Sequence, residues 1–233
     1  MIVKGTTEIL PYVGGVESEE AYKGSVEVYK KASAIPYITD GLVFYVDGIN
    51  KGTVSGSWKD LFGGLVFTGT DVVSTTKGFS FNGTSSNFCC DSVFAGSADY
   101  TIEVCFKSDA LPNPFCIFGI GDNTQYNLLF YRSNNYITFL QRANTYTIPL
   151  SNGQGYSISL NLDRGLVNGA SITKNSGTDY WGNSNSYIGK CSQGRYYSGE
   201  IYAIRIYNRK LTEAEQRTNF AIDNQRFELG VSE

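Results

Sequence analysis

The chain contains no histidine among its 233 residues. Histidine is the usual general base of serine and cysteine hydrolases, a common zinc ligand, and the side chain that titrates near neutral pH. Its absence therefore excludes Ser-His-Asp and Cys-His catalysis, zinc sites built on imidazole, and the usual pH switch.

Long apolar runs and clusters of basic charge are also absent. No apolar run reaches the ~18–20 residues needed to span a bilayer, so we expect no membrane insertion. The net charge is −3 without a basic stripe, so we expect no nucleic acid partner. Residues 1–5 lack the h-region and cleavage site of a signal peptide, which predicts synthesis in the cytoplasm without one.

Cysteine is scarce, and its spacing does not suit a disulfide framework. The number is odd, two cysteines are adjacent, and no CxxC pair occurs: Cys89, Cys90, Cys105, Cys116 and Cys191. This pattern favours buried or half-buried reduced thiols over disulfides or a metal site.

Glycine, tyrosine and phenylalanine are abundant, with 26, 17 and 14 residues. Short segments rich in Tyr, Phe, Thr and Ile, separated by turn residues, are typical of β structure, and about a dozen such segments make up most of the chain. One of them, at 100–107, alternates cleanly, with Ile102, Val104 and Phe106 on one face. We predict an all-β fold, a two-sheet antiparallel jelly-roll sandwich over residues 39–227.

The end of this domain is the most informative stretch. Alternation over 199–207 predicts a strand whose two faces carry different sets of side chains, namely Ile201, Ala203, Arg205 and Tyr207 on one and Tyr202, Ile204 and Ile206 on the other. Thr212 and Glu215 then form a capping box, which predicts a short helix running to about Asn224. Residues 228–233 are expected to form a C-terminal tail.

Residues 1–38 differ from the rest and are predicted to form a β-rich arm. Glycine-containing turns recur about every ten residues, around Gly5, Gly14 and Gly24, and predict three tiny hairpins. Hairpins of this size rarely bury enough surface alone, so we expect the arm to attach the chain to a neighbour or to other copies. The alternative is a frayed β-arm.

Several motifs occur in a characteristic order over residues 40–227: GLVFYVDG, WKDL, FSFNGTSS, YTIEVCFK, SYIGK and GEIYAIRIYNRKLTEAE. In this order they resemble concanavalin A-like jelly rolls of the laminin-G-like type. The resemblance implies a jelly roll and, in most such domains, glycan binding or adhesion, although the fold hosts many functions. The stretch YKGSVEVY at 22–29 resembles N-terminal segments of tailed-phage structural proteins.

Catalysis is not expected. Glycosidases of the resembled fold carry paired carboxylates on one strand, since retaining hydrolysis needs them ~5–5.5 Å apart. No predicted strand carries such a pair, and Glu103, with Lys107 on the same face, is the only glutamate on a mid-domain strand. We predict that the protein is not an enzyme, and a polysaccharide depolymerase is the least favoured alternative.

Sugar binding requires an aromatic ring that stacks on a pyranose and polar groups that bind its hydroxyls. Two segments combine these residue types and provide the predicted glycan contacts: Tyr180, Trp181, Asn183, Arg195, Tyr196 and Tyr197. Core or edge packing is the alternative for each.

A calcium ion is the one cofactor considered. Relatives of the resembled fold often hold calcium, which takes carboxylate and carbonyl oxygens from loops. Asp47, in a Gly-flanked turn, is the candidate ligand. The alternative is an aspartate that hydrogen-bonds its own turn backbone.

The phage resemblance and the missing signal peptide lead to the hypothesis of a bacteriophage virion surface protein, as a capsid decoration, head-fibre or tail-associated component. Residues 1–38 would contact other virion proteins, and the jelly roll would adhere to host-surface polysaccharide with avidity from many copies. Phage fibres are commonly trimeric, so a homotrimer is expected. The alternatives are a carbohydrate-binding module of a bacterial cell-surface or secreted protein, and a purely structural decoration.

Overall fold

The computed structural model describes residues 12–13, 16–17, 20–23, 26–30, 35–52, 56–91, 99–109, 115–120, 127–133, 136–139, 144–148, 150–174, 186–191 and 194–231. For those within 12–30 and 127–145, and for 120 and 147, it describes the backbone alone. The chain divides into two compact units, Met1–Pro36 and Tyr37–Glu233.

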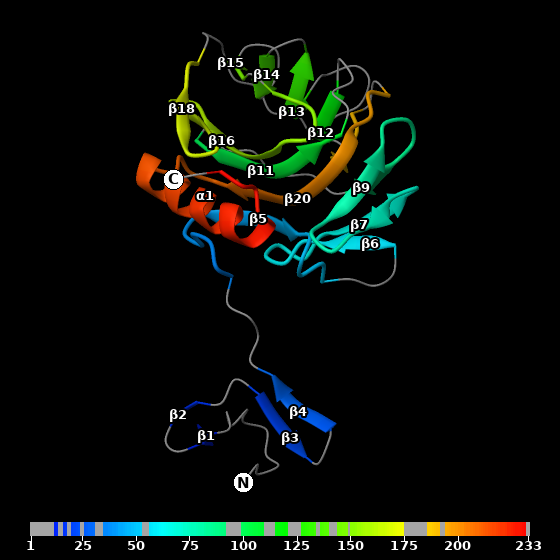
Figure 1. Ribbon diagram of the computed structural model, residues 1–233, viewed down its shortest axis with the longest axis vertical. Helices are drawn as coiled ribbons and strands as arrows, with labels where there is room; N and C mark the ends of the chain where they lie inside the picture. The colour runs from blue at the N-terminus through cyan, green and yellow to red at the C-terminus, as the bar shows by residue number, and fades with distance from the viewer. Residues whose placement is uncertain are drawn as a thin grey trace. The chain divides into compact units, whose positions relative to one another are not determined.

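The described part of the first unit consists of two antiparallel hairpins (Figure 1). In one, β1 (Tyr12–Val13) pairs with β2 (Val16–Glu17), and in the other β3 (Glu20–Lys23) pairs with β4 (Val26–Lys30). Two of the three predicted hairpins are therefore confirmed. The turn predicted at Gly5 lies outside the described residues.

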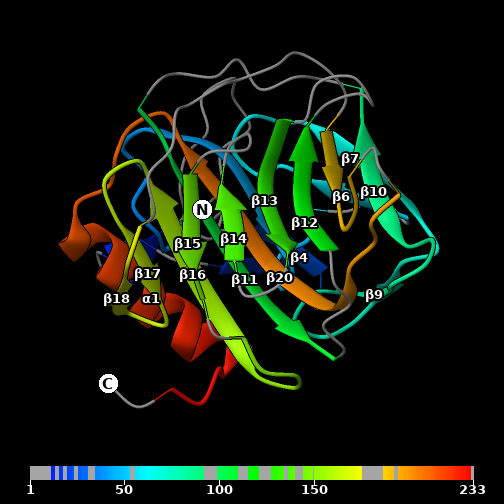
Figure 2. The same ribbon diagram turned by 90° about the horizontal axis from the view of Figure 1, so that it is seen from above.

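The second unit is a sandwich of two antiparallel sheets (Figures 1 and 2). The first, here called the β12 sheet, has the strand order β15 (Asn144–Thr147), β14 (Tyr136–Phe139), β13 (Asn127–Ser133), β12 (Phe115–Ile120), β19 (Ser186–Ile188), β10 (Asn87–Cys90), β7 (Val66–Thr70) and β6 (Ser57–Lys59). The second, the β11 sheet, has the order β18 (Ala170–Ile172), β17 (Gly165–Val167), β16 (Gly155–Asn161), β11 (Thr101–Ser108), β20 (Ser198–Tyr207), β9 (Phe79–Asn82) and β8 (Val73–Ser74), and β5 (Leu42–Asp47) also pairs with β20. The predicted fold class is confirmed.

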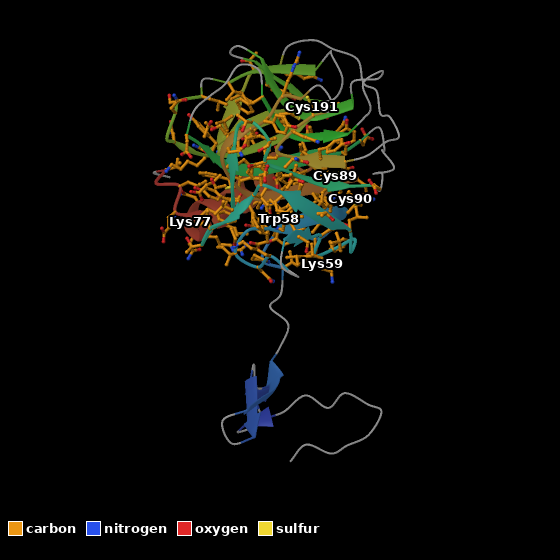
Figure 3. All side chains as sticks on the ribbon, turned by 90° about the vertical axis from the view of Figure 1, so that its right-hand side faces the viewer. Trp58, Lys59, Lys77, Cys89, Cys90 and Cys191 are labelled. Carbon is orange, nitrogen blue, oxygen red and sulfur yellow. The ribbon has the colours of Figure 1, made fainter. Side chains whose placement is uncertain are left out.

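Aromatic side chains fill the space between the sheets. Trp58, labelled in Figure 3, is fully buried, and its ring centroid lies 4.9 Å from that of Phe79 and 5.5 Å from that of Phe88. The indole Nε1 donates to the Asp47 carbonyl at 3.1 Å, so the polar end of the ring is satisfied inside the core. Trp58 therefore stabilises the sandwich and is not a surface residue.

The ten-residue strand β20 contains a β-bulge that the sequence did not predict. A register shift opposite Cys105 and Phe106 of β11 adds Tyr202 to the strand. Ile201 consequently joins the core between the sheets, whereas Tyr202 packs on the outer side with Phe227. The prediction was wrong for Ile201 and Tyr202, because a bulge reverses the pleat beyond it.

The helix α1 (Glu213–Phe227) lies against the outer face of the β11 sheet (Figure 1). It begins with the predicted capping box. The Thr212 hydroxyl accepts from the Glu215 amide at 3.3 Å, and the Glu215 carboxylate accepts from the Thr212 amide at 2.8 Å. The helix runs past its predicted end to Phe227, and Glu228 terminates it in the left-handed conformation, with φ of 51°.

In the part of the chain that the structure describes, no helix is long and apolar enough to cross a membrane.

A buried ionic cluster joins α1 to the β11 sheet. The Arg205 guanidinium donates to Glu103 at 2.8 Å and, through both terminal nitrogens, to Asp223 at 2.9 and 2.7 Å. The guanidinium carbon, Cζ, lies 3.8 Å from the ring centroid of Tyr37. The Tyr37 hydroxyl donates to Asp223 at 2.8 Å. Burial raises the pKa of Glu103, and the charge of Arg205 opposes this effect. Both carboxylates thus depend on one guanidinium for their pairing.

Replacing Arg205 by methionine would leave Glu103 and Asp223 buried without their cation. We expect Arg205→Met to lower the free energy of unfolding by about 3–5 kcal/mol. Urea denaturation followed by tryptophan fluorescence measures this loss. Arg164→Met is the control, since it removes an exposed pair with Glu213 and should cost less than about 1 kcal/mol. Equal losses in the two variants would contradict the importance of the buried cluster.

The capping carboxylate predicts a pH dependence of stability. Hydrogen bonds from Arg209 at 2.9 and 2.7 Å, with smaller contributions from Thr212, lower the pKa of Glu215 from 4.5 to about 2. Because the folded-state pKa is the lower one, the ionised group stabilises the fold above pH 4.5, and this contribution is lost as the pH falls toward 2. Glu215→Gln should flatten the fall in unfolding free energy over this range, measured by urea denaturation at several pH values. An unchanged slope would contradict the prediction.

Candidate functional site

The two outer faces of the sandwich differ in what covers them. On the β11 sheet, α1 contributes five buried side chains: Gln216, Asn219, Phe220, Asp223 and Phe227. On the β12 sheet, the outward side chains Cys89 of β10 and Tyr187 of β19 are half-exposed. Cys89 and Tyr187 therefore place a thiol and an aromatic ring within reach of a ligand on the outer face of the β12 sheet.

The side chains of Cys89 and Tyr187 point outward because side chains alternate along a strand. Phe88 and Ile188 are opposite each other in the ladder, and both are fully buried in the core. Cys89 and Tyr187, the next opposed pair, must point to the other face because successive side chains of a strand alternate. They lie side by side on the outside of the sheet.

A turn at Gly189 brings the following residues back beside β19. Gly189 has a φ of +84°, and a side chain at this position would lie 2.3 Å from a core phenylalanine ring, so the turn requires glycine. Lys190 then forms a β-bridge with Tyr196, and the Tyr197 amide donates to the Gly189 carbonyl at 2.8 Å. These contacts close a small hairpin, here called the hairpin 190–196, of which residues 190–191 and 194–196 are described.

The Lys190 ammonium contacts two tyrosine rings. Its Nζ lies 4.5 Å from the ring centroid of Tyr187 and 6.0 Å from that of Tyr196, within the range of a cation–π interaction. Cys89 hydrogen-bonds Tyr187, and Asp91 lies close enough to affect the Cys89 thiol. These five residues are here called the Tyr187 cluster.

The cluster contains no activated nucleophile. Burial and the Asp91 carboxylate raise the pKa of Cys89, while Lys190 and the hydrogen bond with Tyr187 act in the opposite direction. The thiol is therefore protonated at neutral pH and reacts slowly. Two aromatic rings, an ammonium and a carboxylate remain, which suit binding of a polar ligand better than bond cleavage.

The structure divides the predicted glycan contacts. Arg195 and Tyr196 are half-exposed, and Tyr196 belongs to the Tyr187 cluster. Tyr197 is fully buried and its hydroxyl donates to the Lys107 carbonyl at 2.8 Å, so its predicted role as a ligand contact is corrected to core packing. Three further predicted contacts lie outside the described residues: Tyr180, Trp181 and Asn183.

Hydrogen-bond donors surround the carboxylate of Asp47. Its Oδ1 accepts from the amides of Ile49 and Asn50 at 2.8 and 3.2 Å, and its Oδ2 accepts from Arg226 at 2.6 Å and from the Tyr45 hydroxyl. A calcium ion requires oxygen ligands, whereas a guanidinium occupies this position. The calcium prediction is corrected: Asp47 caps its own turn and pairs with α1. Among the described residues, no group of three or more acidic or cysteine side chains could hold a metal ion.

Glu103, the candidate carboxylate of the depolymerase alternative, lies beneath α1. It is 1% exposed and accepts hydrogen bonds from Arg205, Ser159 and Asn219 at 2.8–2.9 Å. A substrate on the outer face of either sheet would not reach it. Its contacts are those of a structural residue.

Tyr187 and Lys190 were not among the predicted ligand contacts. Both belong to the motif SYIGK, which predicted a strand and no more. The available signal was the position of Tyr187 between two inward side chains, followed by a glycine that turns the chain back.

Comparisons with known proteins identify the fold. No family model and no curated protein matches the sequence. Among solved structures, Trypanosoma rangeli sialidase matches 80% of this chain over 33% of its own, with 18% identity and a TM-score of 0.62. The botulinum neurotoxin type G receptor binding domain matches 78% of this chain over 51% of its own, with 15% identity and a TM-score of 0.55. A third match is domain 4 of AbnA, a GH43 extracellular arabinanase from Geobacillus stearothermophilus, solved in complex with arabinotriose. It matches 77% of this chain over 98% of its own, with 16% identity and a TM-score of 0.54.

These likenesses concern the fold. The chain spans about a third of the length of the sialidase and nearly all of the arabinanase domain. The second unit shares the fold of these three proteins, a two-sheet antiparallel β-sandwich.

All five cysteines are reduced thiols in the structure, four of them are buried as expected, and Cys89 is half-buried. We therefore expect the reduced native protein to react with Ellman's reagent at one thiol and the denatured protein at five. Cys89→Ser should abolish the native reaction and leave four thiols in denaturant. Rapid native reaction at two or more thiols would contradict the burial of the others.

Proposed function

We propose that this domain binds glycans at the Tyr187 cluster. The observation that carries the proposal is the contact of the Lys190 ammonium with the rings of Tyr187 and Tyr196 on the outer face of the β12 sheet. The rings offer apolar faces to a pyranose, and Lys190 and Asp91 offer a donor and an acceptor to its hydroxyls. Tyr187 lies on the paired strand β19, and the bridge between Lys190 and Tyr196 keeps these two residues beside each other.

The fold likeness supports the same function. Arabinotriose is bound in the structure of AbnA domain 4, and sialic acid in one of the sialidase structures. These ligands belong to those proteins. For this chain they make neutral and acidic oligosaccharides the first probes.

We propose binding without catalysis. Three observations support this role: the absence of histidine, the raised pKa of Cys89, and the burial of Glu103 beneath α1. Modest affinity at one site would be compensated by several copies acting together.

The comparisons favour one biological setting over the other. A carbohydrate-binding module of a bacterial cell-surface or secreted protein has their support, because a domain of an extracellular arabinanase shares the fold over nearly its whole length. The virion surface location, the contacts of residues 1–38 with virion proteins and the homotrimer remain predictions. None of the three similar structures named above is a virion protein by its description.

An oligosaccharide array screened with the full chain, followed by calorimetric titration of the tightest ligand, tests the site. We expect Tyr187→Ala and Tyr196→Ala each to weaken binding by about two- to tenfold, since an aromatic contact contributes about 0.5–1.5 kcal/mol. Lys190→Met should weaken binding while keeping the apolar stem. Phe62→Ala, which removes an exposed ring outside the cluster, is the matched control and should bind like the parent.

Unchanged affinity in both tyrosine variants would contradict the assigned site, and no binding across the array would contradict the glycan function. Release of reducing ends during the titration would overturn the non-catalytic role.

A further inference from the structure

Two buried cysteines lie where the hairpin that carries Lys190 and Tyr196 packs on β12. Cys116 of β12 and Cys191, the second residue of the hairpin, are 0% and 1% exposed. They form a small buried cluster of their own, separate from the core between the sheets, and their thiols hydrogen-bond each other.

Gly119 makes this approach feasible. A Cβ at position 119 would lie 3.2 Å from the Cys116 sulfur, 3.4 Å from the Cys191 Cα and 3.1 Å from the Lys190 carbonyl oxygen. Since Gly119 has no side chain, the hairpin lies directly on β12, and Cys191 lies over Cys116. The Cys191 amide donates to the Arg195 carbonyl, and the Gly194 amide donates to the Cys191 carbonyl, which fixes the backbone there.

We propose that Cys116 and Cys191 form an intramolecular disulfide when the chain folds in the presence of a small disulfide oxidant such as glutathione disulfide. One thiolate attacks a sulfur of glutathione disulfide and releases one glutathione. The second thiolate then attacks the protein sulfur of the mixed disulfide and releases the other. Two protein thiols are oxidised, one glutathione disulfide is reduced to two glutathiones, and the two protons of the protein thiols end on the departing glutathione thiolates.

The other cysteines are not placed for this reaction. Cys89 and Cys90 are adjacent in β10 and so face opposite sides of the β12 sheet. Cys105 belongs to the other sheet, in a cluster with Tyr202 and Phe227. Burial raises the pKa of Cys116, so its thiol exchanges slowly once folded, and the bond forms during folding.

The disulfide would link the hairpin 190–196 to β12 and close a loop of about 75 residues, which restricts the unfolded chain strongly. A rise in Tm of about 5–10 °C is therefore expected. This inference depends on the buried thiols alone and is independent of the proposed glycan function.

Refolding the full chain in a glutathione redox buffer, blocking the remaining thiols and digesting with trypsin without reductant tests the proposal. Trypsin separates the cysteines cleanly, with Cys116 on peptide 108–132, Cys191 on peptide 191–195 and the other three on peptide 78–107. We expect peptide 191–195 linked to 108–132, an intact mass about 2 Da lower before blocking, and the rise in Tm.

Three variants complete the test. Cys116→Ala and Cys191→Ala should each lose both the linked peptide and the gain in Tm, whereas Cys89→Ala should keep both. The proposal is overturned if peptide 191–195 stays unlinked in the parent chain, or if it links to peptide 78–107. A linked parent whose Tm equals that of its reduced form would overturn the stabilising role of the bond.

Discussion

The second unit depends on the Arg205 guanidinium, which is buried between α1 and the β11 sheet. It pairs with Glu103 on the neighbouring strand and with Asp223 on the helix, and the Tyr37 ring stacks on its face. A buried charge without a partner is strongly destabilising, so α1 can dock only where Asp223 meets Arg205. The same contacts hold Tyr37, the first residue of the unit, against α1.

Docking of α1 decides which face of the sandwich remains available. The helix covers the outer side of the β11 sheet, whereas Cys89 of β10 and Tyr187 of β19 stay half-exposed on the outer side of the β12 sheet. Two glycines shape this surface. Gly189 turns the chain back after β19, and Gly119 lets the returning hairpin lie directly on β12. The Tyr187 cluster and the buried thiol pair are both consequences of this packing.

Features encoded locally could be predicted from the sequence, and features that depend on distant residues could not. The capping box at Thr212 and the glycine turns of the first unit need only a few neighbouring residues, and both are present. Arg226 occupies the predicted calcium position at Asp47. The two residues are 179 positions apart in the sequence, so no local pattern predicts their contact. The site shows the same limit. Tyr196 was recognisable as an aromatic residue in a polar segment, but its neighbour Tyr197 points into the core, and the contact with Lys190 exists only in the folded chain.

The most direct test of the account is a crystal structure of the full chain with the oligosaccharide that binds it most tightly. We expect a sugar ring packed on Tyr187 or Tyr196, with hydroxyls within hydrogen-bonding distance of Lys190 or Asp91. A sugar bound only elsewhere, for example at the exposed edge near Phe62 or beside α1, would contradict the assignment of the Tyr187 cluster as the binding site.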